Sequence, residues 1–205
     1  MKEYKSINSE NAERIIFEAV EVLKAGGIIL YPTETVYGIG CDARNEKTVE
    51  KIAQFKRRNN KKPNFSIGMA NKKSIKTYTK NSERSKSLID TLLPGPFTII
   101  FESNQIILPE MKTIGIRIPE NSFFSQLLLS SEMVIITTSA NLKGRKAPSC
   151  FVEIEKEVLE FVDYAIDGQC TKYGEGSTII NATQGEHKII RKGAGKLEKN
   201  SNHIR

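Results

Sequence analysis

The stretch GGIILYPTETVYGIG, residues 26–40, contains a helix stop, a short strand and a polar loop. Gly26 and Gly27 can adopt the left-handed backbone that ends a helix. The apolar run at residues 28–31 is typical of a buried strand, and Pro32 ends it because proline cannot donate to a strand ladder. The segment 33–40 is polar and predicts a loop. A strand that follows a helix and ends in such a loop indicates an α/β fold.

A helix is predicted on the N-terminal side of this stretch. Asn8 and Ser9 are good N-cap residues, and apolar residues follow them at helical spacing. The apolar face consists of Ile15, Ile16, Ala19, Val20 and Leu23. We expect this face to pack against the sheet that contains the strand at 28–31.

Helices and strands interleave along the rest of the chain. We predict helices near residues 46–57, 72–79, 83–92, 122–131 and 151–160. We predict strands near 65–69, 97–101, 114–118, 133–137, 162–166, 177–182 and 187–191. Several strands follow one another directly, which favours a twisted mixed sheet with flanking helices over a strictly parallel sheet. We expect a single domain over residues 1–195 and a polar C-terminal tail at 196–205.

The composition is that of a globular protein. Of its 205 residues, 39% are hydrophobic and 27% are charged. The net charge of +7 favours anionic partners such as nucleotides, pyrophosphate, RNA or an acidic protein surface, although a lysine-rich surface alone would also produce it. No apolar run approaches the roughly 20 residues of a membrane span, and the N-terminus has no apolar signal region. We therefore expect a cytoplasmic protein that does not contact membranes.

Cysteine and histidine are scarce. The three cysteines, Cys41, Cys150 and Cys170, are widely spaced, and His187 and His203 are the only histidines. We expect reduced cysteines and no metal site. The two histidines cannot supply a Ser–His–Asp set, and Walker-type and GxGxxG phosphate loops are absent from the sequence.

Two segments in the first third of the chain are candidates for ligand binding. The loop PTETVYG at 32–38 follows a strand, and its hydroxyls suit a small polar ligand, although an ordinary capped turn would look the same. Lys56, Arg57 and Arg58 end a predicted helix. Their charges can stabilise the helix dipole, or they can converge on a polyphosphate.

Two further features lie in the second half of the chain. The segment TTSAN at 137–141 follows a strand, and it can donate to phosphate oxygens or form a simple turn. Arg117 and Arg191 each interrupt an apolar strand, and a buried arginine needs an anionic partner, either a ligand or a carboxylate. Together these features predict a basic, hydroxyl-lined pocket that acts through positioning and electrostatics.

In this order the segments resemble the YrdC/YciO family. The matching segments are PTETVYGIGCDA, KRR, KKP, LPGPFTIIF, GIRIP, TTSAN, GSTIIN and IIRKGA, and the resemblance covers about residues 26–193. The resemblance implies an α/β twisted sheet that encloses a basic concave cavity. It also implies a nucleotidyltransferase that makes threonylcarbamoyl-AMP and pyrophosphate from L-threonine, bicarbonate and ATP. A downstream transferase complex then modifies tRNA, so binding of tRNA or double-stranded RNA is an implied property.

The resemblance also assigns site residues. Lys56 and Arg58 match a basic KxR motif and would be catalytic. The residues implied to contact ATP are Lys56, Arg58, Asn60, Thr113, Ser139, Asn141, Ser149 and Arg191. The residues implied to contact threonine are Thr33, Tyr37, Arg117 and Ser177. Mg²⁺ would accompany ATP through the phosphates and water, with Glu34 as the nearest protein carboxylate and no tightly bound cofactor.

Some positions depart from the synthase pattern. Asn59 follows Arg58 where proline is usual, and Asn64-Phe65-Ser66 is more similar to the YciO branch of the family. The alternative function is therefore a YciO-like nucleotide- or RNA-binding protein without threonine-dependent synthase activity. Ser139, Asn141, Lys56 and Arg58 favour the synthase.

Overall fold

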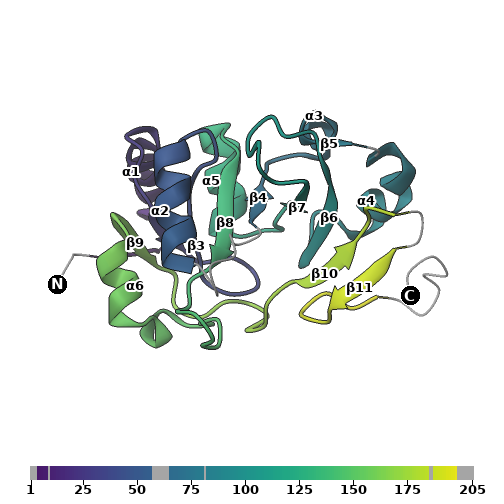
Figure 1. Cartoon of the computed structure of the whole chain (residues 1–205). Helices are drawn as coiled ribbons and strands as arrows, with labels where there is room; N and C mark the ends of the chain where they lie inside the picture. The colour runs from purple at the N-terminus through teal and green to yellow at the C-terminus, as the bar shows by residue number, and fades with distance from the viewer. Residues whose placement is uncertain (1–3, 9, 57–64, 81, 185–186, 198–205) are drawn as a thin grey trace.

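The computed structural model describes residues 4–8, 10–56, 65–80, 82–184 and 187–197, which form a mixed sheet with helices packed on it (Figure 1). The helices are α1 (Ala12–Lys24), α2 (Glu46–Lys56), α3 (Ile75–Tyr78), α4 (Lys86–Leu92), α5 (Phe123–Ser131) and α6 (Lys156–Phe161). Three short 3₁₀ helices are η1 (Lys72–Ser74), η2 (Ser82–Ser85) and η3 (Phe151–Glu153). The strands are β1 (Tyr4–Ser6), β2 (Ile29–Tyr31), β3 (Gly38–Asp42), β4 (Ser66–Gly68), β5 (Thr79–Lys80), β6 (Phe97–Ser103), β7 (Thr113–Arg117), β8 (Ile135–Ser139), β9 (Tyr164–Asp167), β10 (Thr178–Asn181) and β11 (Lys188–Arg191).

The sheet is mixed, as predicted. The strand order is β1-β9-β2-β3-β8-β4-β7-β6-β10-β11, and β5 pairs with β6 outside this order. The sheet contains parallel pairs such as β4–β7 and β6–β10 and antiparallel pairs such as β3–β8 and β6–β7. Figure 1 shows α1, α2, α5 and α6 at one end of the sheet and α3 and α4 at the other.

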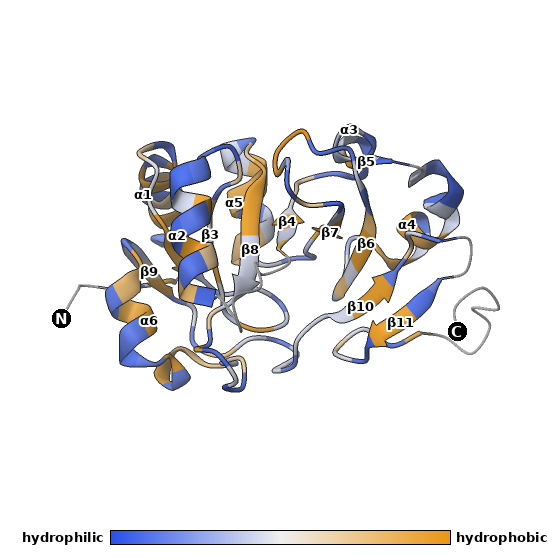
Figure 2. Ribbon diagram, in the orientation of Figure 1, coloured by the Kyte–Doolittle hydropathy of each residue, from blue (hydrophilic) through white to orange (hydrophobic). Residues whose placement is uncertain are grey.

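Helix α1 forms where the sequence predicts it. Its five predicted apolar residues are all buried, and they form a core with α5 and one face of β2. In β2 the side chains alternate, so that Ile29 and Tyr31 join this core while Leu30 joins the larger core on the other face. Figure 2 shows hydrophobic colours on much of β6, β8 and β10, whereas α2 carries both hydrophilic and hydrophobic colours.

Strand β3 is a correction to the predicted loop at 33–40. The loop ends at Tyr37, and β3 begins at Gly38. Glycines at 38 and 40 suggested a turn, but here they permit close packing: a Cβ on Gly40 would lie 2.1 Å from the carbonyl oxygen of Ile136. A strand interior can contain glycine where another backbone approaches closely.

Other differences are local. Strands β1 and β5 were not predicted, and the helix expected at 151–160 is split into η3 and α6. The split occurs because Ile154 is extended and buried against the core, while the Glu155 carboxylate accepts a hydrogen bond from the Leu142 amide. The predicted tail at 196–205 lies mostly outside the described residues, although Leu197 packs against the core.

Small residues cross the middle of the sheet in one row. The register aligns Gly40 of β3 with Thr137 of β8, Thr137 with Ser66 of β4, and Ser66 with Gly115 of β7. A Cβ on Gly115 would lie 2.5 Å from the Ser66 hydroxyl. Two members of this row, Ser66 and Thr137, border a cavity on the sheet.

The described part of the chain contains no helix long and apolar enough to cross a membrane.

The expectation of three reduced cysteines is wrong for one pair. Cys150 and Cys170 form a disulfide, and their backbones form an antiparallel bridge. Cys41 is free and buried in β3, and its burial raises the pKa of its thiol to about 12. Disulfides are rare in the cytosol of mesophiles, so this pairing argues against the expected cytoplasmic location. The location stays a prediction.

Thiol titration tests this pairing. Unfolded without reductant, the chain should expose one reactive thiol, from Cys41, and reduction should raise this to all three cysteines. The crosslinked positions are 20 residues apart, so the Cys150→Ser variant should lose about 3 kcal/mol of unfolding free energy. Three reactive thiols before reduction would contradict the structure.

Candidate active site

A polar cavity of about 180 Å³ lies above the row of small residues. Its lining residues are Thr33, Val36, Tyr37, Gly38, Ser66, Thr98, Arg117, Thr137, Thr138, Ser139, Ala147, Gly176, Ser177, Ile179 and Arg191. The volume is below the range of drug-sized pockets, which suits a small polar ligand or one part of a larger one.

The sheet register brings the two predicted arginines to this cavity. Ile179 of β10 lies opposite Thr98 of β6 and also opposite Arg191 of β11. The antiparallel register of β6 and β7, continued by one residue, places Thr98 opposite Arg117. The four residues therefore form a row across four strands, with a guanidinium at each end.

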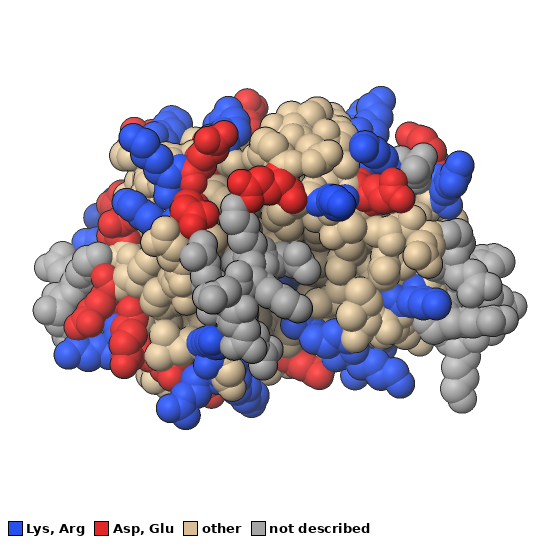
Figure 3. Space-filling model, viewed as in Figure 1, with Lys and Arg blue, Asp and Glu red and all other residues tan. Residues whose placement is uncertain are grey.

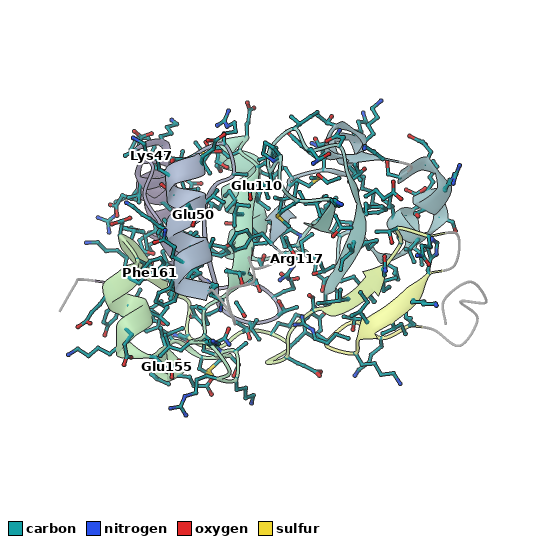
Figure 4. All side chains as sticks on the ribbon, viewed as in Figure 1. Lys47, Glu50, Glu110, Arg117, Glu155 and Phe161 are labelled. Atoms are coloured by element: carbon teal, nitrogen blue, oxygen red, sulfur yellow. A yellow bond between two sulfur atoms is a disulfide. The ribbon has the colours of Figure 1, made fainter. Side chains whose placement is uncertain are left out.

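Arg117 is buried and paired with a carboxylate. It is 8% exposed, and its Nη2 donates to Glu34 Oε1 at 2.8 Å and to Thr35 Oγ1 at 2.9 Å. Glu34 is 2% exposed, so both charges of the pair are desolvated. Figure 4 labels Arg117 in the middle of the molecule, between α2 and β6. A buried ion pair of this kind is retained only where strong hydrogen bonds support it.

The loop that carries Glu34 is held by its own hydroxyl groups and by its neighbours. Thr33 Oγ1 donates to the Val36 carbonyl at 2.7 Å and accepts from the Thr35 amide. The Tyr37 hydroxyl donates to the Gln169 carbonyl at 2.9 Å, and its burial raises its pKa. Thr33 and Tyr37 line the cavity, but their hydroxyls already have partners in the fold, and their contact with threonine stays a prediction.

The far wall of the cavity contains Arg191 and Ser177. Arg191 donates from Nη2 to the Ser177 carbonyl at 2.8 Å, and its Nε donates to the same oxygen at 3.2 Å. The Ser177 and Thr98 hydroxyls lie 2.7 Å apart. Arg191 as a whole residue is exposed, in contrast to the buried arginine that the sequence predicts, and among the described residues its acceptors are the carbonyl and the hydroxyl of Ser177. Partial burial of the guanidinium, and then the charge of Arg117, lowers the pKa of Arg191. The guanidinium groups thus repel each other, and a bound anion would relieve this repulsion.

The sequence predicts that the TTSAN segment follows a strand, but its first three residues are the end of β8. The chain bends at Ala140, and we call residues Ser139–Asn141, beside the cavity, the Ser139 turn. The Ser139 hydroxyl donates to Asn141 Oδ1 at 2.5 Å. Lys56, the last residue of α2, donates to the Ser139 carbonyl at 2.8 Å and to the Asn141 carbonyl at 2.7 Å. The structure thus brings Lys56 to Ser139 and Asn141, which lie 83 and 85 residues later in the chain.

Four predicted residues are placed differently or are not described. Thr113 lies at the opposite end of β7 from Arg117 and lines a larger cavity of about 780 Å³ between α2 and residues 107–113. That cavity is mainly apolar, so the smaller one, where the charged groups converge, is the candidate site. Ser149 bonds Glu153 through its hydroxyl and amide. Arg58 and Asn60 lie outside the described residues.

Three residues near the cavity have roles that the sequence does not predict. Glu34, expected only as the nearest carboxylate to Mg²⁺, pairs with Arg117. Thr98 and Ser66 both line the cavity, although Ser66 stands out in the sequence only as part of the YciO-like segment 64–66. A hydroxyl inside the apolar run FTIIF was a usable signal, because a buried hydroxyl needs a partner.

The charged surface is mixed. Figure 3 shows Lys and Arg side chains along the lower edge of this view, with acidic residues between them. Exposed basic residues follow the TTSAN turn at Lys143, Arg145 and Lys146, and others lie on and after β11 at Lys188 and Lys192. The cavity itself contains two guanidiniums, and an extended basic concave surface stays a prediction. The described residues contain no group of three or more His, Cys, Asp or Glu side chains placed to hold a metal ion.

Comparison with known proteins identifies relatives over the whole domain. Residues 21–193 match the family model Sua5_yciO_yrdC, described as telomere recombination. A Methanocaldococcus jannaschii protein, provisionally named threonylcarbamoyl-AMP synthase, is 39% identical over 94% of this chain and 92% of its own length. A Pyrococcus abyssi protein named threonylcarbamoyl-AMP synthase is 28% identical over 88% of this chain, but this match spans only 54% of that protein.

Solved structures share the fold. The structure of Escherichia coli YciO matches with a TM-score of 0.81 and 26% identity, over 97% of this chain and 98% of that one. The structure of P. abyssi Sua5 complexed with L-threonine matches with a TM-score of 0.87 and 24% identity, over 100% of this chain and 63% of that one. At 24% identity, the match to the P. abyssi structure shows a shared fold and nothing more.

The buried ion pair gives a stability prediction. The Glu34→Gln variant keeps the side-chain shape but leaves the Arg117 charge buried without its carboxylate. Removing one partner of a buried pair costs about 3–5 kcal/mol, so urea denaturation should show a loss of that size. The control is Glu160→Gln, which removes an exposed pair with Lys156 and should change stability little. Equal stability of the two variants would contradict the role of the pair.

Proposed function

The chain belongs to the Sua5/YciO/YrdC family, and from this premise we propose that it is a threonylcarbamoyl-AMP synthase. It would form threonylcarbamoyl-AMP and pyrophosphate from L-threonine, bicarbonate and ATP, as a nucleotidyltransferase. The observation that carries the proposal is the convergence of Arg117 and Arg191 on one small cavity beside the Ser139 turn. The relatives named for this activity support it.

The charges of the cavity suit the substrates. Arg117 and Arg191 contribute two positive charges, and Glu34 contributes one negative charge, which leaves one net positive charge for an anion. In our proposal the threonine carboxylate lies between the guanidiniums, since arginine binds carboxylates in a bidentate geometry. Thr137, Thr138 and Ser139 also line the cavity, and we propose that a nucleotide phosphate approaches from their side.

The chemistry needs no covalent intermediate on the protein. The threonine amine forms an N–C bond with bicarbonate, whose C–OH bond breaks so that water leaves and a carbamate remains. A carbamate oxygen then attacks the α-phosphorus of ATP. The new O–P bond forms as the bond to the β-phosphate oxygen breaks, and pyrophosphate leaves. Negative charge spreads over the phosphoryl oxygens in the transition state, and fixed cations and donors stabilise it. Mg²⁺ enters with ATP as part of the substrate, and the product would pass to a transferase that modifies tRNA.

A second candidate follows from the YciO likeness, which covers nearly all of both chains. Under it the cavity binds a nucleotide or RNA, and threonine has no effect on turnover. The two candidates differ in one observable, the dependence of pyrophosphate release on L-threonine.

Pyrophosphate release from ATP and bicarbonate should therefore require L-threonine, and L-serine should substitute poorly. Arg191→Gln removes one guanidinium from the cavity and should lower the threonine-dependent rate by roughly a hundredfold, the usual effect of losing one electrostatic donor. Lys188→Gln lies on the same strand and is exposed, so its rate should stay close to wild type. Pyrophosphate release at the same rate with and without L-threonine would favour the YciO-like candidate.

A further inference from the structure

The Lys56 ammonium forms its hydrogen bonds with other groups of the protein. Its ammonium donates to three acceptors: the Ser139 carbonyl at 2.8 Å, the Asn141 carbonyl at 2.7 Å and Asn141 Oδ1 at 3.1 Å. A lysine ammonium has three protons and no acceptor capacity. Each proton therefore has a carbonyl partner within the described structure, and all three partners belong to one turn.

The same turn is tied to other parts of the fold through neighbouring groups. The Ala140 amide donates to the Tyr37 carbonyl at 2.9 Å, which connects the turn to the loop that carries Glu34. The Leu142 amide donates to Glu155 Oε2 at 3.0 Å, at the start of α6. Asn141 Nδ2 donates to the Arg145 carbonyl at 2.7 Å. Lys56 thus contributes the contact from α2 to a turn that is also held from two other sides.

The Ser139 hydroxyl depends on this arrangement. It donates to Asn141 Oδ1, which also accepts from Lys56. Since Ser139 lines the cavity, the position of its hydroxyl relative to a ligand is coupled to the lysine. Burial lowers the pKa of Lys56 to about 8, whereas the carbonyl acceptors favour its charged form.

We propose that Lys56 is a positioning residue, which fixes the Ser139–Asn141 turn through its carbonyl oxygens before any nucleotide binds. This differs from the role in direct phosphate contact that the sequence implies. A phosphate could reach the ammonium only by replacing a carbonyl partner. The consequence for catalysis rests on the proposed function, but the contacts themselves do not.

Hydrogen exchange of the ligand-free chain separates the two roles. The Ala140 and Leu142 amides are hydrogen bonded to other parts of the fold, so their exchange reports how firmly the turn is held. Lys56→Met keeps the length of the side chain and removes its protons. Exchange in residues 138–142 should accelerate by about tenfold or more, as expected when charged hydrogen bonds are lost. The amides of α1 should be unchanged, which shows that the variant is folded.

Two controls sharpen the experiment. Lys51→Met lies on the same helix and is exposed, so its exchange should match wild type. Lys56→Arg keeps the charge, but a planar guanidinium cannot direct three protons to these carbonyls, so it should only partly restore protection. Wild-type exchange in ligand-free Lys56→Met would overturn the proposal and leave phosphate contact as the role.

Ligand binding provides the readout that a general loss of structure would not give. In calorimetry, Lys56→Met should weaken ATP binding by about tenfold or more and leave L-threonine binding nearly unchanged, because the turn lies on the nucleotide side. Equal weakening of both ligands would overturn the positioning role. If the wild type shows no threonine-dependent turnover but the exchange effect is present, the positioning role stands and the synthase proposal fails.

Discussion

The structure depends on keeping one guanidinium charged in the middle of a sheet. Arg117 ends β7 at 8% exposure, where an unpaired charge would cost several kcal/mol. Glu34 supplies the opposite charge from a loop 83 residues earlier in the chain. The pair must be held in place because neither side chain can relax toward water. Much of the structure around the cavity serves to fix the loop that carries Glu34.

That loop is fixed from several directions. The Tyr173 amide donates to the Glu34 carbonyl at 2.9 Å, and the Thr171 hydroxyl donates to the Thr35 carbonyl at 2.7 Å. Both donors lie just after Cys170, whose disulfide with Cys150 joins the two segments beneath the loop. The Tyr37 amide donates to the Pro148 carbonyl on the same side. A rigid frame of this kind suits a site that acts by positioning and electrostatics.

The sequence predicted the elements that depend on local pattern. The apolar face of α1, the helix at 46–57 and most strands appear in the structure, because each follows from hydrophobic periodicity and from cap or turn residues. Strand β3 was not predicted because its glycines look like turn residues. Gly40 is required there because the Ile136 carbonyl of the neighbouring strand β8 lies too close for a side chain. Such a contact is not encoded locally.

Some residues that line the cavity, such as Arg117 and Ser139, could be chosen from the sequence, but their partners could not. The expectation that Arg117 needs an anionic partner is confirmed, although Glu34 could not be chosen from other carboxylates without the fold. The same holds for Lys56, whose acceptors lie 83 and 85 residues away, and for the disulfide between Cys150 and Cys170. Thr113 illustrates the converse, since its strand places it beside a different cavity from Arg117.

The central claim is that this cavity joins a threonine carbamate to the α-phosphate of ATP. The most direct test supplies ¹³C-labelled bicarbonate with ATP and L-threonine and analyses the products by mass spectrometry. We expect an adenylate that contains threonine and one ¹³C atom, and that is absent when threonine is omitted. Turnover of ATP that leaves no ¹³C in any adenylate would contradict this claim.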